Sequence, residues 1–253
     1  MKSSFNKDKL ITISILPIMW LAYFLFELFT GRITTLYDAL LNLSLIILFA
    51  LTGLIIYKSS EKFSSGFTTK CKVIIFIVLM LFDQGIKLII KFTCFDAFVE
   101  IIPKFLFFNP IINTHGSWLN ARFDLAANFP ALISLNAVFL FILFELYRYG
   151  KSKEHNSFWM DMCFLFILSG ALCSLIDKVF YGGSLDFIGI SSLFIADIKD
   201  LYINLGLLFF IMFIYKCDYF KEEDVSLKDD LMAIKNFLSF VKNDVLRKNK
   251  KKR

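Results

Sequence analysis

Six long runs of apolar residues, separated by polar segments, dominate the hydropathy pattern of this 253-residue chain. Each run is close to the roughly 20 residues that a helix needs to cross the hydrocarbon core of a bilayer. The runs lack the strict alternation of barrel strands, and barrels are the only other structure that spans a membrane. We therefore predict six membrane-spanning helices, at Leu10–Phe29, Leu36–Tyr57, Val73–Phe92, Pro130–Tyr147, Phe158–Ile176 and Ala196–Tyr215.

The segment between the third and fourth runs, Thr93–Phe129, has a different pattern. Its middle is rich in aromatic and β-branched residues, and it contains Pro103 and Pro110. Proline removes a backbone donor and clashes inside a helix, so we expect short strands lying on the outer membrane surface. The predicted fold class is an all-α polytopic membrane protein with a small extracytoplasmic β-rich segment between spans three and four.

After Tyr215 the chain becomes polar, and apolar residues recur at helical spacing from Leu227 to Val245. This indicates an amphipathic helix, which is followed by a basic end that anionic lipid would attract. A solvated tail that serves only as a topology signal is the alternative. The polar loop Lys58–Lys72 suggests three parts: a two-span extension at residues 1–60, a four-span core at 72–216 and a cytoplasmic tail at 217–253.

Composition and charge agree with this organisation. The chain is 57% hydrophobic and only 20% charged, whereas soluble domains are about a quarter charged. Lysine and arginine concentrate at both ends and in alternate connections, which predicts that both termini are cytoplasmic. The pI near 9.0 therefore reflects topology, and no nucleic-acid partner is expected. The five cysteines show no C-x-x-C spacing, so neither a disulfide framework nor a zinc site is expected.

Two aspartates mark the ends of the last two runs. Asp177 closes the fifth run and Asp197 opens the sixth, so a helical hairpin must place both on the same side of the bilayer, the outer side. Carboxylates at membrane depth are costly and are usually retained for function. Two that lie close together suit acid–base chemistry, because like charges push their pKa values apart.

Two further groups of polar residues stand out. Asp83 and Lys87 are spaced to form an ion pair on one face of the third helix, and a structural pair is the default interpretation. Asn113 and Gly116 suit a turn, and the neighbouring His115 is given no role.

Taken in order, these blocks resemble the lipoprotein signal peptidase (signal peptidase II) family. That family has an Asp-Gln-x-x-Lys block, an Ile-Pro-x-Phe segment, an Asn-x-Gly block, an aspartate closing one span, an Asp-Phe-Ile stretch and an Ala-Asp at the last span. The resemblance covers about Val73 to Tyr215. The matching residues are Asp83, Gln84 and Lys87; Ile102, Pro103 and Phe105; Asn113 and Gly116; Asp177; Asp186, Phe187 and Ile188; and Ala196 and Asp197.

The resemblance implies an aspartyl endopeptidase that cleaves signal peptides before a diacylglyceryl-modified cysteine, without metal or cofactor. It implies a multi-pass protein of the bacterial cytoplasmic membrane, acting as a monomer on lipid-modified prolipoproteins among membrane lipids, with its active site near the outer face. Asp177 and Asp197 correspond to the catalytic pair. Substrate-binding or supporting roles are expected for Asp83, Lys87, Asn113, Gly116, Ser174, Lys178 and Asp186.

The chain departs from the family pattern beside both predicted catalytic residues. Ser174 and Phe194 stand where the family has asparagines, Cys173 replaces a glycine and Lys178 an arginine. Phe194 can neither donate nor accept a hydrogen bond. These changes keep an alternative open, a non-catalytic or proton-coupled transport protein with the same fold. A membrane adaptor is a third possibility, which no motif supports.

Overall fold

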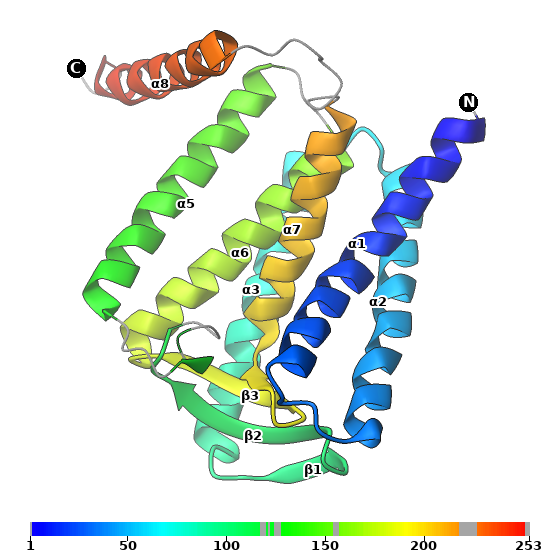
Figure 1. Cartoon of the computed structure of the whole chain (residues 1–253). Coiled ribbons are helices and arrows are strands. Elements are labelled where there is room, and N and C mark those ends of the chain that lie inside the picture. Colours follow the sequence, from blue (N-terminus) through cyan, green and yellow to red (C-terminus); the bar gives the residue numbers. More distant parts are fainter. Residues whose placement is uncertain are drawn as a thin grey trace.

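A computed structural model of the chain describes residues 2–116, 120, 122–123, 128–153, 157–217 and 227–250. Six of its helices are long and apolar enough to cross a membrane (Figure 1). All six predicted spans are confirmed, and most of the helices extend a few residues beyond the predicted ends. They are α1 (Lys2–Phe29), α2 (Leu36–Lys62), α3 (Thr69–Thr93), α5 (Phe129–Ser152), α6 (Phe158–Phe180) and α7 (Ile198–Lys216). The protein is thus an all-α polytopic membrane protein.

Side-chain caps fix where most of these helices begin. An N-cap oxygen satisfies one of the backbone N–H groups that the first helical turn leaves free. Asp197 caps α7 and forms a reciprocal capping box with Asp200. The other capping residues are Thr35 for α2, Thr68 for α3, Asn128 for α5 and Ser157 for α6.

A four-stranded antiparallel sheet closes one end of the bundle (Figure 1). The predicted strands are present as β1 (Val99–Ile102) and β2 (Leu106–Asn113), and Pro110 lies where the register of β2 shifts. A bulge of this kind tolerates a residue that cannot donate to the ladder. The prediction was incomplete, because β3 (Ser184–Ile190) and β4 (Phe194–Ala196), from the connection between α6 and α7, complete the sheet.

Helices α1 and α2 pack against the core helices through a shared hydrophobic cluster. Ile15 and Leu16 of α1 and Ile56 of α2 belong to the same cluster as Leu208 and Phe209 of α7. Elsewhere the helices present many exposed apolar side chains, such as Leu81 and Leu135, as expected where lipid is the solvent. The α1–α2 pair is therefore joined to the rest of the bundle by apolar packing.

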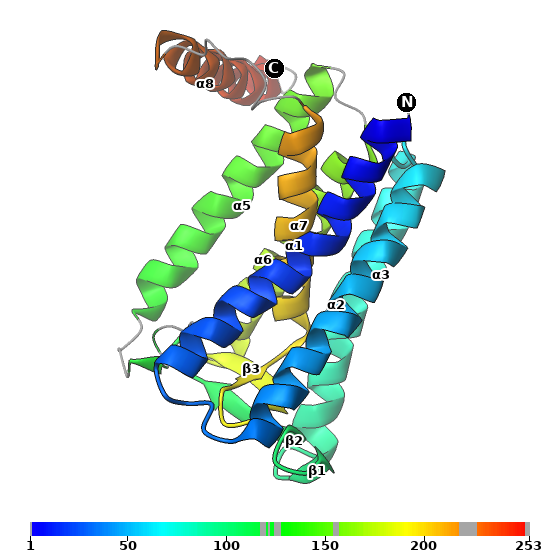
Figure 2. The same cartoon turned by 45° about the vertical axis from the view of Figure 1, so that its right-hand side comes forward.

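The amphipathic helix expected near the C-terminus is present as α8 (Leu227–Lys250). It lies beside α5 at the end of the bundle opposite the sheet, the end at which the N-terminus also lies (Figures 1 and 2). Arg148 Nη2 of α5 donates to Asp244 Oδ1 at 2.7 Å, and the Tyr149 ring packs edge-on against Phe237 and Phe240. Residues 218–226 and 251–253 of the predicted tail lie outside the described residues.

Candidate active site

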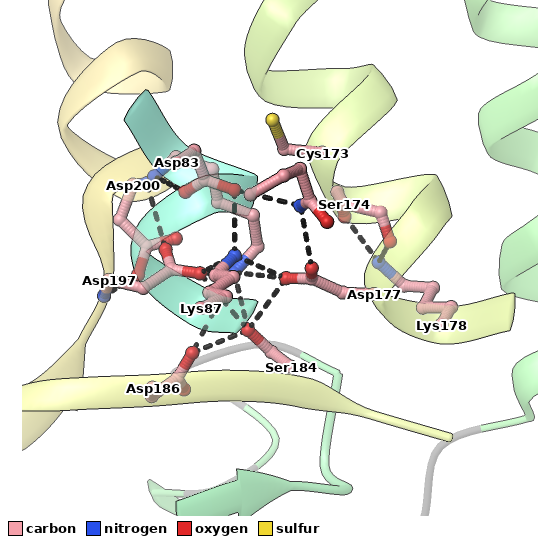
Figure 3. Close-up of polar contacts among 12 residues, drawn as sticks. Asp83, Lys87, Cys173, Ser174, Asp177, Lys178, Ser184, Asp186, Asp197 and Asp200 are labelled. Atoms are coloured by element: carbon pink, nitrogen blue, oxygen red, sulfur yellow. Dashed lines mark hydrogen bonds and ion pairs between the residues drawn. The ribbon is translucent and has the colours of Figure 1, made fainter. Parts of the chain in front are cut away.

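The ammonium group of Lys87 joins three helices at the sheet end of the bundle (Figure 3). Its Nζ lies 3.0 Å from Asp83 Oδ2 on its own helix α3, 2.7 Å from Asp177 Oδ2 on α6, and 2.5 Å from Asp197 Oδ2 at the start of α7. All four residues are fully buried. The expected Asp83–Lys87 ion pair is present, and the same lysine holds Asp177 and Asp197 together.

Asp83 and Asp177 use both of their carboxylate oxygens in contacts within the protein. Gln84 Nε2 donates to Asp83 Oδ2 at 2.9 Å and to Asp177 Oδ1 at 3.1 Å. The remaining oxygen of Asp83 accepts the backbone N–H of Lys199 at 2.9 Å. Buried charges are tolerated when they are paired and hydrogen-bonded in this way. These two aspartates therefore hold α3, α6 and α7 in register.

A second buried ammonium, that of Lys199, lies among the carboxylates. Its Nζ is 2.5 Å from Asp197 Oδ2, 3.4 Å from Asp177 Oδ2 and 3.7 Å from Asp186 Oδ1. It also donates to the hydroxyl of Ser184. Asp197 thus contacts two ammonium groups, one from α3 and one from its own helix.

Asp186 projects from the buried strand β3 toward the start of α7. Its Oδ2 accepts from Asn113 Nδ2 on β2 at 2.9 Å, and its Oδ1 accepts from Ser184. One carboxylate oxygen from each of Asp186, Asp197 and Asp200 lies within 4.8 Å of the other two. Pairing of β2 with β3 thus brings a third carboxylate group, on Asp186, to the capped end of α7.

Part of this group lines a cleft of about 1110 Å³. Among the predicted site residues, the cleft is lined by Asn113, Gly116, Ser174, Lys178, Asp186 and Asp197. Asp83, Lys87 and Asp177 are not among its described lining residues. The nine predicted site residues therefore divide into six that line the cleft and three that do not.

The pKa values of the Asp186 and Asp197 carboxyl groups are shifted in opposite directions. Burial raises the pKa of Asp186, and Lys199 offsets this only in part. Burial also acts to raise the pKa of Asp197, but Lys199 and Lys87 beside it lower it overall. Two neighbouring carboxyl groups whose environments separate their pKa values have the properties needed for an acid and a base.

The remaining predicted residues have local roles. Gly116 has φ +75°, a backbone conformation that favours glycine, which agrees with the predicted turn. Lys178 Nζ donates to the hydroxyl and to the backbone carbonyl of Ser174, one turn earlier in α6. The ring of Phe194 packs edge-on against Trp20 and Tyr23 of α1. Phe194 therefore packs β4 against α1. The resemblance to the signal peptidase II family predicted an asparagine at this position, which could have formed hydrogen bonds near Asp197.

The three clustered carboxylates have a spacing that a divalent cation could use. However, Lys199 Nζ already contacts two of them, Asp186 and Asp197. The positive charge at this position is supplied by the chain itself, and the arrangement gives no ground for assigning a metal or cofactor.

Sequence reasoning missed three residues at the site: Ser184, Lys199 and Asp200. Ser184 Oγ lies 3.5 Å from both Asp177 Oδ2 and Asp197 Oδ2 and therefore bridges two carboxylates. A signal for the other two was available, because a lysine and a second aspartate in the first turn of an apolar run are costly. For Ser184 no comparable signal exists in a single sequence.

Comparison with known proteins agrees with this architecture. The model of the family described as signal peptidase (SPase) II matches residues 75–216. The fold resembles a bacterial membrane enzyme solved in meso at 2.3 Å, with a TM-score of 0.51 and 23% identity over 65% of this chain and 98% of that one. Another bacterial membrane enzyme, solved at 1.9 Å, gives a TM-score of 0.47 and 22% identity over 59% of this chain and 95% of its own. No curated protein matches the chain.

The fold and the buried carboxylate site define a multi-pass membrane protein with a cluster of buried charged groups at the sheet end of its helical bundle. The matched segment covers more than half of the chain and contains every predicted site residue. The protein belongs to the signal peptidase II family, which is a family of peptidases. Helices α1 and α2 precede the matched segment.

Proposed function

We propose that the protein is an aspartyl endopeptidase that cleaves signal peptides from diacylglyceryl-modified prolipoproteins, and that Asp186 and Asp197 are its catalytic pair. Family membership supports the reaction class. The observation that carries the choice of residues is that the two carboxylates lie within 4.8 Å of each other on the wall of the cleft. A peptide bond that entered the cleft could reach both.

The sequence prediction paired Asp197 with Asp177, and we place Asp186 in that role because Asp186 and Asp197 line the cleft and Asp177 does not. Burial does not distinguish the two predicted aspartates, since Asp177 and Asp197 are both fully buried. A catalytic group must come within hydrogen-bond reach of the atom that it protonates or deprotonates. We assign Asp177 to holding Lys87 beside Asp197, which makes it a positioning residue.

In the proposed reaction Asp197 acts as the base and Asp186 as the acid. Asp197 takes a proton from a water molecule, whose oxygen adds to the scissile carbonyl carbon. Asp186 gives its proton to the carbonyl oxygen. The resulting tetrahedral intermediate collapses as the C–N bond breaks, and the amide nitrogen leaves with a proton returned by the pair. Since the two groups interact strongly, they titrate as a unit.

The orientation follows from the distribution of positive charge. The N-terminus and α8 lie at the end of the bundle opposite the sheet (Figure 1). The excess of lysine and arginine at both termini supports a cytoplasmic position for that end. The sheet and the carboxylates then lie near the outer face of the cytoplasmic membrane, where a lipidated substrate would be presented.

The test is cleavage of a lipidated prolipoprotein by the purified full-length protein and by three isosteric variants. Asp197→Asn and Asp186→Asn should each lower turnover on the order of 10²–10⁴-fold with the fold intact. Asparagine is also a good N-cap, so the first variant keeps the start of α7. Asp177→Asn should lower the melting temperature but retain far more turnover per folded molecule than the other two.

The results separate two errors. If Asp177→Asn is as inactive as Asp197→Asn while Asp186→Asn still turns over, the pair assigned here is wrong but the peptidase is not. If the wild-type protein is folded and cleaves no lipidated substrate, the peptidase proposal itself fails.

One observation favours the non-catalytic alternative. Lys199 Nζ contacts both carboxylates of the proposed pair, at the place where a hydrolytic water would have to bind. In a non-catalytic member of the family, the two lysines and the surrounding carboxylates would form a structural network or a proton path. Absence of cleavage by both the wild-type protein and a Lys199→Met variant, each shown to be folded, would support that alternative.

A further inference from the structure

Helices α1 and α2 lie outside the family segment, yet they build part of the cleft. Leu16, Met19, Trp20 and Tyr23 of α1 and Phe49 of α2 line it, and we call these five residues the apolar wall. We propose that the apolar wall binds an acyl chain of the lipid-modified substrate. This inference rests on the proposed function for the identity of the lipid, and its test separates the two.

The apolar wall is fixed in place and offers hydrocarbon to the cleft. Trp20 Nε1, the only polar side-chain atom of Trp20, donates to the backbone carbonyl of Asn42 on α2 at 2.8 Å. The indole ring lies 5.5 Å from the Phe49 ring and 6.3 Å from the Phe194 ring between centroids. Trp20 and Leu16 are buried. A rigid aromatic surface whose indole N–H is already bonded suits an apolar ligand.

The depth of the apolar wall in the membrane can be compared with the thickness of one leaflet. Leu16 lies about 20 Å along the helix axis from Phe29, the last residue of α1, at about 1.5 Å per residue. Half of a bilayer's hydrocarbon core is roughly 15 Å. Tyr23, the wall residue of α1 nearest to Phe29, lies about 9 Å from it along the same axis. The wall therefore lies around the middle of the membrane, at the depth where the end of an acyl chain of one leaflet lies.

The cleft has polar lining residues as well as the apolar wall. The polar ones include Asp186 of β3 and, around the start of α7, Asp197, Lys199 and Asp200. The apolar side chains of Leu201 and Ile203 of α7 also line the cleft and are about half exposed. A hydrocarbon chain leaves no polar group unpaired along such walls, whereas the backbone of a bound peptide would need partners.

The cleft runs without interruption from the apolar wall to the proposed catalytic pair. A chain attached next to the scissile bond would lie along the wall when the peptide carbonyl lies at Asp186 and Asp197. This continuity is the reason for assigning the site to the lipid of the substrate instead of to bulk phospholipid. It also gives the additional helices a direct role in substrate selection.

Photocrosslinking of the full-length protein in phospholipid nanodiscs tests the inference. The probe is a diacylglyceryl lipopeptide with a diazirine near the end of one acyl chain, and labelled residues are mapped by mass spectrometry. Label should map to the apolar wall. Phe49→Trp, which narrows the cleft, should reduce labelling on the order of tenfold, because displacing roughly two methylene groups from an apolar site weakens binding by that factor.

The matched control is Leu48→Trp, which makes the same addition on the exposed side of α2 and should leave labelling unchanged. Melting temperatures of both variants establish that they are folded. Label that maps away from the wall, or a phospholipid with the same diazirine that labels the wall equally well and competes with the lipopeptide, would overturn the inference. Labelling does not require turnover. A protein that binds the lipopeptide at the wall without cleaving it would refute only the proposed function.

Discussion

Replacing Lys199 with methionine removes one of the two ammonium groups beside Asp197 and leaves a side chain of similar length. Lys199 Nζ lies 2.5 Å from Asp197 Oδ2 and 3.7 Å from Asp186 Oδ1. The backbone N–H that donates to Asp83 stays in place. Lys87 of α3 still contacts Asp197, and Asp177 of α6 and Asp200 of α7 remain as negative neighbours. The variant therefore changes the charge at the site while keeping the helix cap.

An adjacent opposite charge lowers the pKa of a carboxyl group by about 1–3 units, and each unit corresponds to about 1.4 kcal/mol. Loss of Lys199 removes a positive charge, so the pKa values of Asp197 and Asp186 both rise. The base is then protonated at a higher pH, which moves the acid limb of the rate profile upward. The acid keeps its proton to a higher pH, which moves the alkaline limb upward too. The whole profile should shift by about 1–3 pH units.

The assay is kcat/KM for a lipidated prolipoprotein across the pH range at which the protein stays folded, measured for wild type, Lys199→Met and Lys199→Arg. The arginine variant keeps the charge and should keep the limbs near their wild-type positions, even if its bulk slows the reaction. The reasoning is refuted if Lys199→Met is active and its profile coincides with that of the wild type. A shift to lower pH would refute it equally, since it would give Lys199 the wrong electrostatic sign.

Three further outcomes follow from the structure. Asp161→Asn should lower the free energy of unfolding by about 3–5 kcal/mol without changing turnover per folded molecule. The reason is that the buried Asp161 accepts hydrogen bonds from Phe67 N at 2.8 Å and Tyr147 Oη at 2.7 Å and pairs with Lys151 at 3.0 Å. An unchanged melting curve would contradict this. Phe194→Asn should lower the free energy of unfolding by about 1–3 kcal/mol through the loss of two aromatic pairs, and it should not raise the cleavage rate. A variant that cleaves faster would show that Phe194 merely lowers the activity of the wild-type site. A single cysteine at residue 120 in a cysteine-free background should react with reagents applied to the outer face, and labelling from the cytoplasmic side alone would reverse the orientation.

The helices were predictable because the lipid phase imposes a simple rule on the sequence. A membrane span must hydrogen-bond its backbone polar groups within itself and needs about 20 apolar residues to cross the bilayer. Each of the six apolar runs is close to this length. Strands β3 and β4 escaped prediction for a different reason. In Ser184–Ile190 three consecutive residues, Leu185 to Phe187, are buried, so the alternation that reveals a half-exposed strand is absent. Their register depends on pairing with β2, which is a long-range property.

The candidate site was predicted in its residue types more than in its arrangement. Motif spacing drew attention to Asp83, Lys87, Asp177, Asp186 and Asp197, and the structure gathers all of them. Which aspartates face the cleft depends on how β3 crosses the ends of α6 and α7, and a single sequence does not encode that directly. Lys199 was overlooked because a lysine near the end of a span is typically an interfacial residue that extends toward water, whereas here it is 5% exposed.

The altered position beside Asp197 and the additional helices are two parts of one structural change. A phenylalanine in place of a polar residue near a carboxylate would add little stability unless its ring were covered by apolar groups. The rings that cover Phe194 are those of Trp20 and Tyr23 of α1. The hydrogen-bonding function that an asparagine could have supplied is met instead from α7. Asp197 accepts the N–H of Asp200 at 3.2 Å and pairs with Lys199. The presence of α1 therefore makes an aromatic residue favourable at position 194, and the charge on Lys199 supplies Asp197 with a polar partner from α7. Phe194, one of the changed positions that kept the non-catalytic alternative open, is thus consistent with a site rebuilt around the same carboxylates.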